Sequence, residues 1–115
     1  MKGPITTHVL DTAIGRPAKG LPITLKVRKG SEWSELAKGI TDDDGRIMDL
    51  LPANHQLEKN EYLMVFDTKS YFSKMSKQDF YPEVQVHFNI TDPKDGHFHI
   101  PLLLSPFGYS TYRGS

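Results

Sequence analysis

Residues 97–115 read HFHIPLLLSPFGYSTYRGS and predict two strands joined by a tight turn. Pro106 and Gly108 divide this stretch into segments 97–104 and 109–113, because both residue types favour turns. Successive side chains of a strand point to opposite faces, so the first segment separates into two sets. One set is apolar and suits a protein core: Ile100, Leu102 and Leu104. The other set includes two imidazoles: His97, His99, Pro101 and Leu103.

The rest of the sequence predicts further short strands and one helix. Apolar patterns indicate strands over 5–11, 21–28, 32–40, 46–51, 61–67 and 83–90. The run 61–67 is almost continuously apolar, which is typical of a strand buried on both faces. Phe72, Met75 and Phe80 recur at roughly helical spacing, so we expect a helix over 70–80 that ends at Tyr81-Pro82. The pattern favours an all-β sandwich of two antiparallel sheets, with the last strand at an edge open to a second copy.

The composition excludes several classes of protein. We expect the 115 residues to form a single domain, 1–115. Lys plus Arg and Asp plus Glu each number 14, and a formal net charge of zero argues against nucleic-acid binding. The chain contains no cysteine, which excludes disulfide and thiolate chemistry. No signal peptide or membrane-spanning run is visible, so we expect no membrane partner and a cytoplasmic or peroxisomal location; a processed periplasmic form would look the same.

Polar residues from distant parts of the sequence form a candidate catalytic set. His8 lies in the first predicted strand, Arg46 follows an Asp-Asp-Asp-Gly turn, and His99 lies in segment 97–104. Ser115 supplies a hydroxyl and the terminal carboxylate. A neutral imidazole can remove a proton from water, and a cation can stabilise the oxyanion that forms on the attacked carbonyl. Such a hydrolase would need these strands in one sheet, with the side chains on one face.

Each of these residues also has an ordinary structural interpretation. His8 suits a half-exposed strand histidine, and Arg46 suits a hairpin arginine that offsets the neighbouring aspartates. A zinc-binding interaction module built on His8, His97 and His99 is another alternative, since zinc binds imidazole readily. Zinc needs three or four ligands, and no Asp or Glu lies within the histidine motifs, so we expect no metal site.

Motifs at both ends of the chain resemble the signatures of the transthyretin family. The N-terminal motif comprises His8-Val9-Leu10-Asp11, Gly15-x-Pro17-Ala18 and Leu21-x-Ile23. The C-terminal motif comprises Phe98-His99-Ile100-Pro101 and Leu104-Ser105-Pro106-Phe107-Gly108-Tyr109-Ser110. The ending Tyr112-Arg113-Gly114-Ser115 is similar to that of the family's enzyme branch, the 5-hydroxyisourate hydrolases. The resemblance covers nearly the whole chain.

The resemblance implies a prealbumin-like sandwich of two four-stranded antiparallel sheets with one short helix. It also implies a homotetramer in which subunits join edge to edge and two dimers stack face to face. The active sites would lie at the dimer–dimer interface. The family's functional residues fall on these positions: His8, Arg46, His99, Tyr112 and Ser115. Their expected supporting residues are Pro101, Arg113 and Gly114, whereas His97 is a neighbour without an assigned role.

The reaction implied is the cofactor-free hydrolysis of 5-hydroxyisourate, the unstable product of urate oxidation. Water opens a ring amide to give 2-oxo-4-hydroxy-4-carboxy-5-ureidoimidazoline. His8 and His99 would position and deprotonate the water, with either as the base, while Arg46 and Tyr112 bind the substrate and Ser115 orders the histidines. The alternative within this fold is a thyroid-hormone carrier, a branch with lysine, glutamate and threonine in place of His8, Arg46 and His99.

Overall fold

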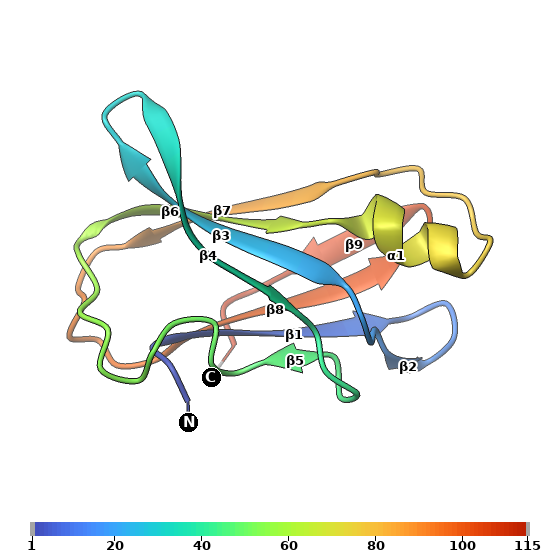
Figure 1. Cartoon of the computed structure of the whole chain (residues 1–115), viewed down its shortest axis with the longest axis horizontal. Helices are drawn as coiled ribbons and strands as arrows, with labels where there is room; N and C mark the ends of the chain where they lie inside the picture. Colours follow the sequence, from blue (N-terminus) through green and yellow to red (C-terminus); the bar gives the residue numbers. More distant parts are fainter. Residues whose placement is uncertain (1, 115) are drawn as a thin grey trace.

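The computed structural model describes residues 2–114, which form two β-sheets packed face to face, with one short helix (Figure 1). The elements in chain order are β1 (Ile5–Asp11), β2 (Arg16–Pro17), β3 (Pro22–Lys29), β4 (Glu32–Ile40), β5 (Arg46–Ile47), β6 (Asn60–Phe66), α1 (Thr68–Lys74), β7 (Val84–Ile90), β8 (Phe98–Ser105) and β9 (Gly108–Thr111). The expected all-β sandwich is confirmed. No helix within residues 2–114 combines the length and the apolar character needed to cross a membrane.

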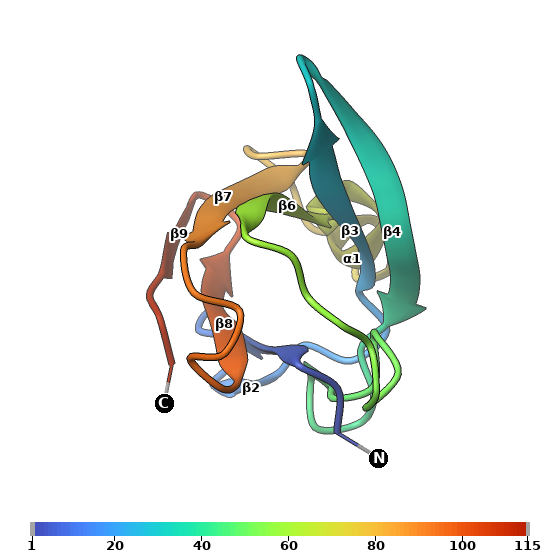
Figure 2. The ribbon, with the colours of Figure 1, turned by 90° about the vertical axis from the view of Figure 1, so that its left-hand side faces the viewer.

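The two sheets differ in their strand order. The five-stranded sheet has the order β2-β1-β8-β9, and β5 also pairs with β1. The four-stranded sheet has the order β4-β3-β6-β7. Figure 2 shows the sandwich end-on, with β7 and β9 close together on one side and the β3–β4 hairpin projecting beyond the body. β9 is therefore an edge strand, as the sequence predicts.

The five-stranded sheet departs from the expected pair of four-stranded antiparallel sheets. Its β1 and β8 run parallel over seven paired residues, from Ile5 opposite Phe98 to Asp11 opposite Leu104. Parallel neighbours need a long crossover, and here the whole second sheet lies between them in sequence. The extra strand arises because two very short segments, β2 and β5, share the other edge of β1. β5 is correspondingly shorter than the predicted strand 46–51.

Apolar side chains from both sheets fill the space between them. β1 turns Ile5, Thr7 and Val9 inward, and β8 turns Ile100, Leu102 and Leu104 inward, as period-two alternation requires. The middle of β6 is buried at three consecutive positions: Tyr62, Leu63 and Met64. The inward set of β8 and the buried character of β6 were both predictable from sequence. The outward-facing residues of β1 and β8 therefore form a surface on the opposite side of the sheet from the core.

The helix is shorter than the predicted 70–80 segment. It begins after Asp67, whose carboxylate accepts the N–H of Ser70 at 3.1 Å as an N-cap. The chain then leaves the helix at Met75, and Ser76 has a left-handed φ of 52°. Phe80 therefore lies outside the helix and is 61% exposed. The expected end at Tyr81-Pro82 was wrong because the turn at Ser76 ends the helix first.

One buried polar contact holds this helix to the strand that carries His8. The hydroxyl of Tyr71 in α1 donates to the carboxylate of Asp11 at the end of β1, at 2.7 Å. Asp11 is 1% exposed, and its other oxygen accepts the N–H of Ala13 at 3.0 Å. Burial, followed by the hydrogen bond and charge of Asp11, raises the pKa of Tyr71 well above its ordinary value. The phenol consequently stays protonated and able to donate.

We predict that Tyr71→Phe destabilises the fold, because the buried carboxylate of Asp11 then loses a donor. The free energy of unfolding should fall by about 1.5–3 kcal/mol, the range for hydrogen bonds to charged groups. Urea denaturation measures this difference. The exposed Tyr109 provides a matched control, and Tyr109→Phe should change stability by less than about 0.5 kcal/mol. Equal stabilities for the two variants would contradict the role of this contact.

Candidate functional site

A small pocket on the outward face of the five-stranded sheet collects most of the basic residues singled out in the sequence. Its lining residues come from the N-terminal segment, β1, the β5 region and the start of β8: Lys2, His8, Arg46, Met48, His97 and His99. Its volume is about 190 Å³. None of these six described residues carries a carboxylate, so the pocket suits an anionic or carbonyl-rich ligand.

Strand pairing explains why residues so far apart in sequence meet here. β5 places Arg46 directly opposite His8. On the other side of β1, β8 places Pro101 opposite His8 and His99 opposite Thr6. Residues two apart on one strand share a face, so His8 and His99 are diagonal neighbours on the outward face. Figure 1 shows β5, β1 and β8 side by side.

The turn before Arg46 is built to present this side chain. A carboxylate oxygen of Asp42 accepts the N–H groups of Asp44 and Arg46, both at 2.9 Å. Gly45 has a φ of +73°, and its carbonyl accepts the N–H of Val9 in β1 at 2.7 Å. A Cβ at this position would approach the carbonyl oxygen of Val9 to 2.4 Å, which only glycine avoids. The turn therefore docks on β1 and fixes Arg46 beside His8.

Thr6 lies between the two imidazoles of the His-x-His pair. Its hydroxyl is 2.7 Å from Nε2 of His97 and 2.7 Å from Nδ1 of His99. The two rings are roughly parallel, with an interplanar angle of 27° and centroids 6.1 Å apart. Because Nδ1 of His99 faces Thr6, its Nε2 is the nitrogen left for a ligand.

The environment favours the neutral, proton-accepting form of both histidines. Burial lowers the pKa of His99 below its ordinary value, and four nearby basic groups add to this effect: His97, His8, Arg46 and Lys2. Burial, followed by the charge of Lys2, also lowers the pKa of His97. A histidine that stays neutral at neutral pH is suited to act as a general base.

The C-terminal tail supports the ring of His99 from one side. The N–H of Gly114 donates to the carbonyl of His99 at 2.9 Å, and the two residues form an isolated antiparallel bridge. A Cβ on Gly114 would lie 2.5 Å from Cδ2 of the imidazole. Only glycine lets the tail pass this close to the ring. Steric clearance therefore accounts for a glycine at position 114.

The other described residues expected at the site do not line this pocket. Pro101 is buried opposite His8. Tyr112 is 58% exposed and does not line the pocket of this chain. The guanidinium of Arg113 lies over the ring of Phe98, 4.8 Å from its centroid, and 3.4 Å from the carboxylate of Asp95. Ser115 lies outside the described residues.

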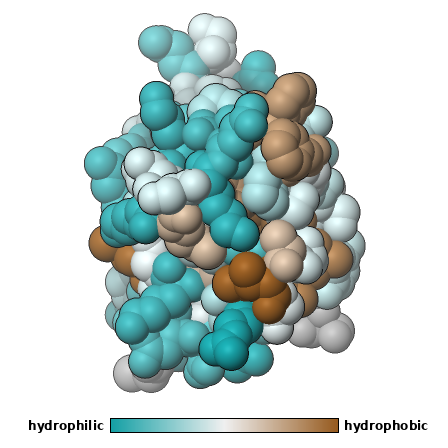
Figure 3. Space-filling view, turned by 90° about the vertical axis from the view of Figure 1, so that its right-hand side faces the viewer, coloured by the Kyte–Doolittle hydropathy of each residue, from teal (hydrophilic) through white to brown (hydrophobic). Residues whose placement is uncertain are grey.

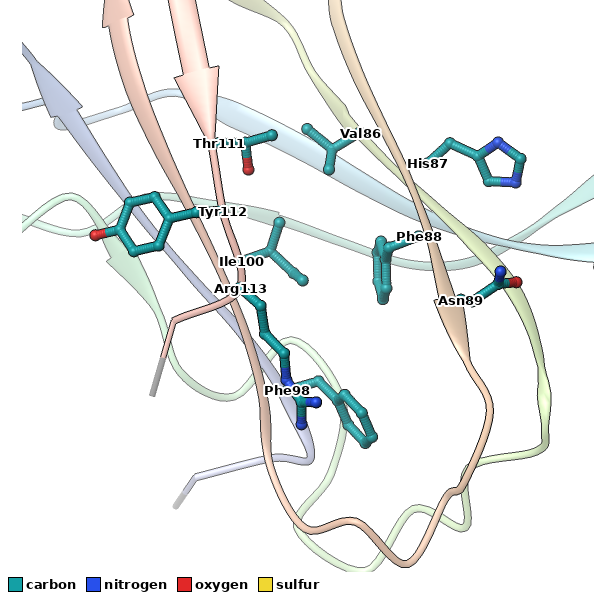
Figure 4. A pocket seen from close by; sticks show the side chains of 9 residues that line it. All are labelled: Val86, His87, Phe88, Asn89, Phe98, Ile100, Thr111, Tyr112 and Arg113. Atoms are coloured by element: carbon teal, nitrogen blue, oxygen red, sulfur yellow. The ribbon is translucent and has the colours of Figure 1, made fainter.

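A larger cavity of about 270 Å³ opens between the edge strands β7 and β9 and is distinct from the histidine pocket. In Figure 4, Val86, Phe88 and Ile100 turn toward its interior, while the ring of Tyr112 points away from them. Alternation along the tail places Arg113 on the inward side and Tyr112 on the outward side of the sheet. Tyr112 therefore shares a sheet face with the imidazoles, although it does not touch the pocket.

Sequence reasoning did not single out Thr6, Lys2 or Met48 as site residues, and it gave His97 no role in catalysis. Thr6 could have been found, because it lies two residues before His8 and must share its strand face. Lys2 and Met48 lie outside regular strands, so no periodicity indicates where they point. Within residues 2–114, no three His, Cys, Asp or Glu side chains are grouped in a way that could hold a metal ion. The zinc-module alternative gains no support from this arrangement.

Comparisons with known proteins agree with these motifs. Residues 5–114 match the model of the HIUase/Transthyretin family. A mouse protein described as a 5-hydroxyisourate hydrolase is 46% identical over 114 residues, covering 97% of this chain and 95% of the relative. The structure of Klebsiella pneumoniae 5-hydroxyisourate hydrolase has a TM-score of 0.82 and 33% identity, covering 96% of this chain and 98% of that one.

A sea bream transthyretin in complex with thyroxine aligns with a TM-score of 0.90 and 30% identity, covering 96% of this chain and 94% of that one. The backbone is therefore common to hydrolases and to a hormone-binding protein, and it does not separate the two activities. With a family model that spans nearly every described residue and relatives above 40% identity, the chain belongs to the HIUase/Transthyretin family.

Proposed function

We propose that this protein hydrolyses 5-hydroxyisourate to 2-oxo-4-hydroxy-4-carboxy-5-ureidoimidazoline, a step in urate degradation. The observation that carries the proposal is the pocket in which His8, His99 and Arg46 meet on one sheet face. Curated relatives described as 5-hydroxyisourate hydrolases support the same activity. The chemistry needs no cofactor, because imidazole and guanidinium groups supply a base and an oxyanion partner.

The proposed reaction uses water as the nucleophile. A neutral imidazole removes a proton from water, and the resulting hydroxide adds to the ring amide carbonyl. Arg46 stabilises the negative charge that forms on the carbonyl oxygen. When the tetrahedral intermediate collapses, the C–N bond breaks and the imidazolium returns the proton to the leaving nitrogen. The reaction opens the ring and regenerates the neutral imidazole.

Two further residues have proposed roles next to this centre. Tyr112 would bind the substrate, which fits its position on the same sheet face as the imidazoles and its exposed side chain. Ser115 would order the histidines; the contact of its neighbour Gly114 with His99 supports this role indirectly. Both roles place the end of the chain at the catalytic centre.

We further propose that the active protein is a homotetramer whose sites lie between dimers. The pocket of a single chain holds about 190 Å³, whereas ligand sites usually enclose roughly 300–1,000 Å³. Leu10 and Leu103 lie opposite each other on the same outward face and are only partly buried. A second copy over this face would cover them and enclose the substrate.

The end of the molecule near α1 offers additional apolar surface, visible as brown patches in Figure 3. Ile14, Phe80 and Phe107 belong to the turns at this end and are 41%, 61% and 63% exposed. Phe80 lies 6.4 Å from Phe107, centroid to centroid, so these rings form one aromatic group. Exposed aromatic clusters commonly mark interfaces, which is consistent with subunit contacts here.

The hormone-carrier alternative has the support of the high structural similarity to sea bream transthyretin. The polar residues of the pocket count against it. A large iodinated ligand prefers an apolar lining, whereas Lys2, His8 and Arg46 make this one basic. The basic lining of the pocket therefore favours the hydrolase function over the carrier function.

The purified protein should accelerate the decay of freshly generated 5-hydroxyisourate, followed by ultraviolet absorbance after urate oxidation. The expected acceleration follows from the base and cation in the pocket. A parallel measurement of thyroxine binding separates the two functions. Tight thyroxine binding without accelerated decay would favour the carrier.

We predict that His8→Asn and His99→Asn each lower kcat by about 100-fold or more, the usual effect of losing a general base or its partner. Both residues are only partly buried, so the fold and the oligomeric mass should be preserved. Steady-state kinetics and light scattering measure the two properties. His55→Asn, in a loop away from the pocket, serves as the control. Native turnover in both test variants would refute these roles.

The pH dependence of kcat/KM should show a neutral base with a lowered pKa. Because the pKa of His99 is shifted downward, its basic form persists to lower pH than an ordinary histidine. kcat/KM should therefore stay constant through neutral pH and fall on acidification, with a midpoint below the ordinary value of 6.5. Stopped-flow assays in buffers of constant ionic strength measure the profile. A midpoint above 6.5 would contradict the described electrostatics.

A further inference from the structure

The Thr6 side chain is unusual for the outward face of a sheet, because it is completely buried. Its nearest polar partners are the imidazoles of His97 and His99, at 2.7 Å each. The paired position of Thr6 opposite His99 in the β1–β8 ladder holds the hydroxyl at this place. The contact therefore joins two histidines through one hydroxyl.

A count of protons restricts how this contact can form. A threonine hydroxyl has one hydrogen to donate and lone pairs to accept. The oxygen could accept an N–H from both rings, but its own buried hydrogen would then have no acceptor among the described contacts of Thr6. When both rings are neutral and this hydrogen is also bonded here, one ring presents an N–H to the oxygen and the other presents a lone pair. Burial lowers the pKa of both histidines, so the neutral state is the relevant one near neutral pH. Only two arrangements of protons satisfy these conditions.

We infer that Thr6 and His97 are positioning residues that fix the tautomer of His99, an inference that rests on the proposed hydrolase function. Nδ1–H of His99 donates to the Thr6 hydroxyl, and this hydroxyl donates to Nε2 of His97. Nε2 of His99 then keeps a free lone pair for water. This order of hydrogen bonds suits His99 to the base role, which the strand pairing alone leaves open between His8 and His99.

The opposite order would place a hydrogen on Nε2 of His99 and leave no base at that atom. The groups facing His99 also favour the proposed order for catalysis. Lys2, His8 and Arg46 are basic, so a lone pair on Nε2 avoids directing another N–H toward them. The tail helps to hold the ring, since Gly114 leaves no room for a Cβ beside Cδ2. Nδ1 thus stays directed at Thr6.

The test compares two neighbouring threonines of β1. Thr6→Val removes the hydroxyl while keeping the shape, and Thr6→Ser keeps the hydroxyl. Thr7→Val is the matched control, because Thr7 is equally buried but donates to the carbonyl of Ile100 on the inner face. His97→Phe removes the acceptor of the Thr6 proton. Urea denaturation of each variant gives the folded fraction by which rates are corrected.

Two measurements on these variants are needed. Nitrogen-15 NMR of the imidazoles without substrate should show the Nδ1–H tautomer of His99 in the native protein. Thr6→Val and His97→Phe should raise the share of the Nε2–H tautomer. With 5-hydroxyisourate, Thr6→Val should lower kcat about 10-fold or more with little change in KM, whereas Thr6→Ser should stay within about threefold of native. Thr7→Val should retain native kcat.

A native His99 in the Nε2–H tautomer would overturn the inference. Equal losses of kcat in Thr6→Val and Thr7→Val would also overturn it, because they would indicate a structural effect only. The NMR measurement needs no turnover, so it separates this inference from the proposed function. A native protein that shows the Nδ1–H tautomer but no hydrolysis would refute the proposed function and leave the order of hydrogen bonds supported.

Discussion

Ile5–Asp11 and the segment from Phe98 to Leu104 lie side by side in a parallel ladder, and this pairing sets the position of most residues of the candidate site. On the outward face it aligns Thr6 with His99 and His8 with Pro101. The free edge of β1 then accepts β5, which adds Arg46. A shift of one residue would turn every one of these side chains to the other face. Such a shift is disfavoured because the inward residues of both strands are packed in the core.

The pocket gathers basic groups, and this arrangement carries an electrostatic cost. Burial, followed by the repulsion of the neighbouring basic groups, lowers the pKa of His99. In the proposed reaction, burial and this repulsion together keep an imidazole neutral, while the guanidinium charge of Arg46 is available for a developing oxyanion. The proposed function of the site therefore relies on a combination of charges that would be unfavourable in an ordinary surface cluster.

Several parts of the fold could be predicted because they depend on local pattern. Alternation identified the inward residues of β8, and the Asp-Gly turn signal identified the position of Arg46. Other parts depend on partners far away in sequence. The parallel direction of β8 follows from the path of the whole chain, and Phe80 fits a helical spacing even though the helix ends before it. The contact of Thr6 could not be predicted, because threonine is common in strands. Only the structure shows that its hydroxyl lies against two histidines.

The separation of β1 from β8 in sequence has a consequence for biosynthesis. During translation β1 emerges first, but its parallel partner begins only at Phe98. Pairings of such long range form slowly, since the loop must close before the contacts can compensate for it. Because β2 and β5 pair with the other edge, a nascent chain would thus expose the β8-facing edge of β1 until β8 leaves the ribosome, a state open to wrong strand pairing. The face that carries the candidate site is accordingly assembled late, after the four-stranded sheet has been synthesised.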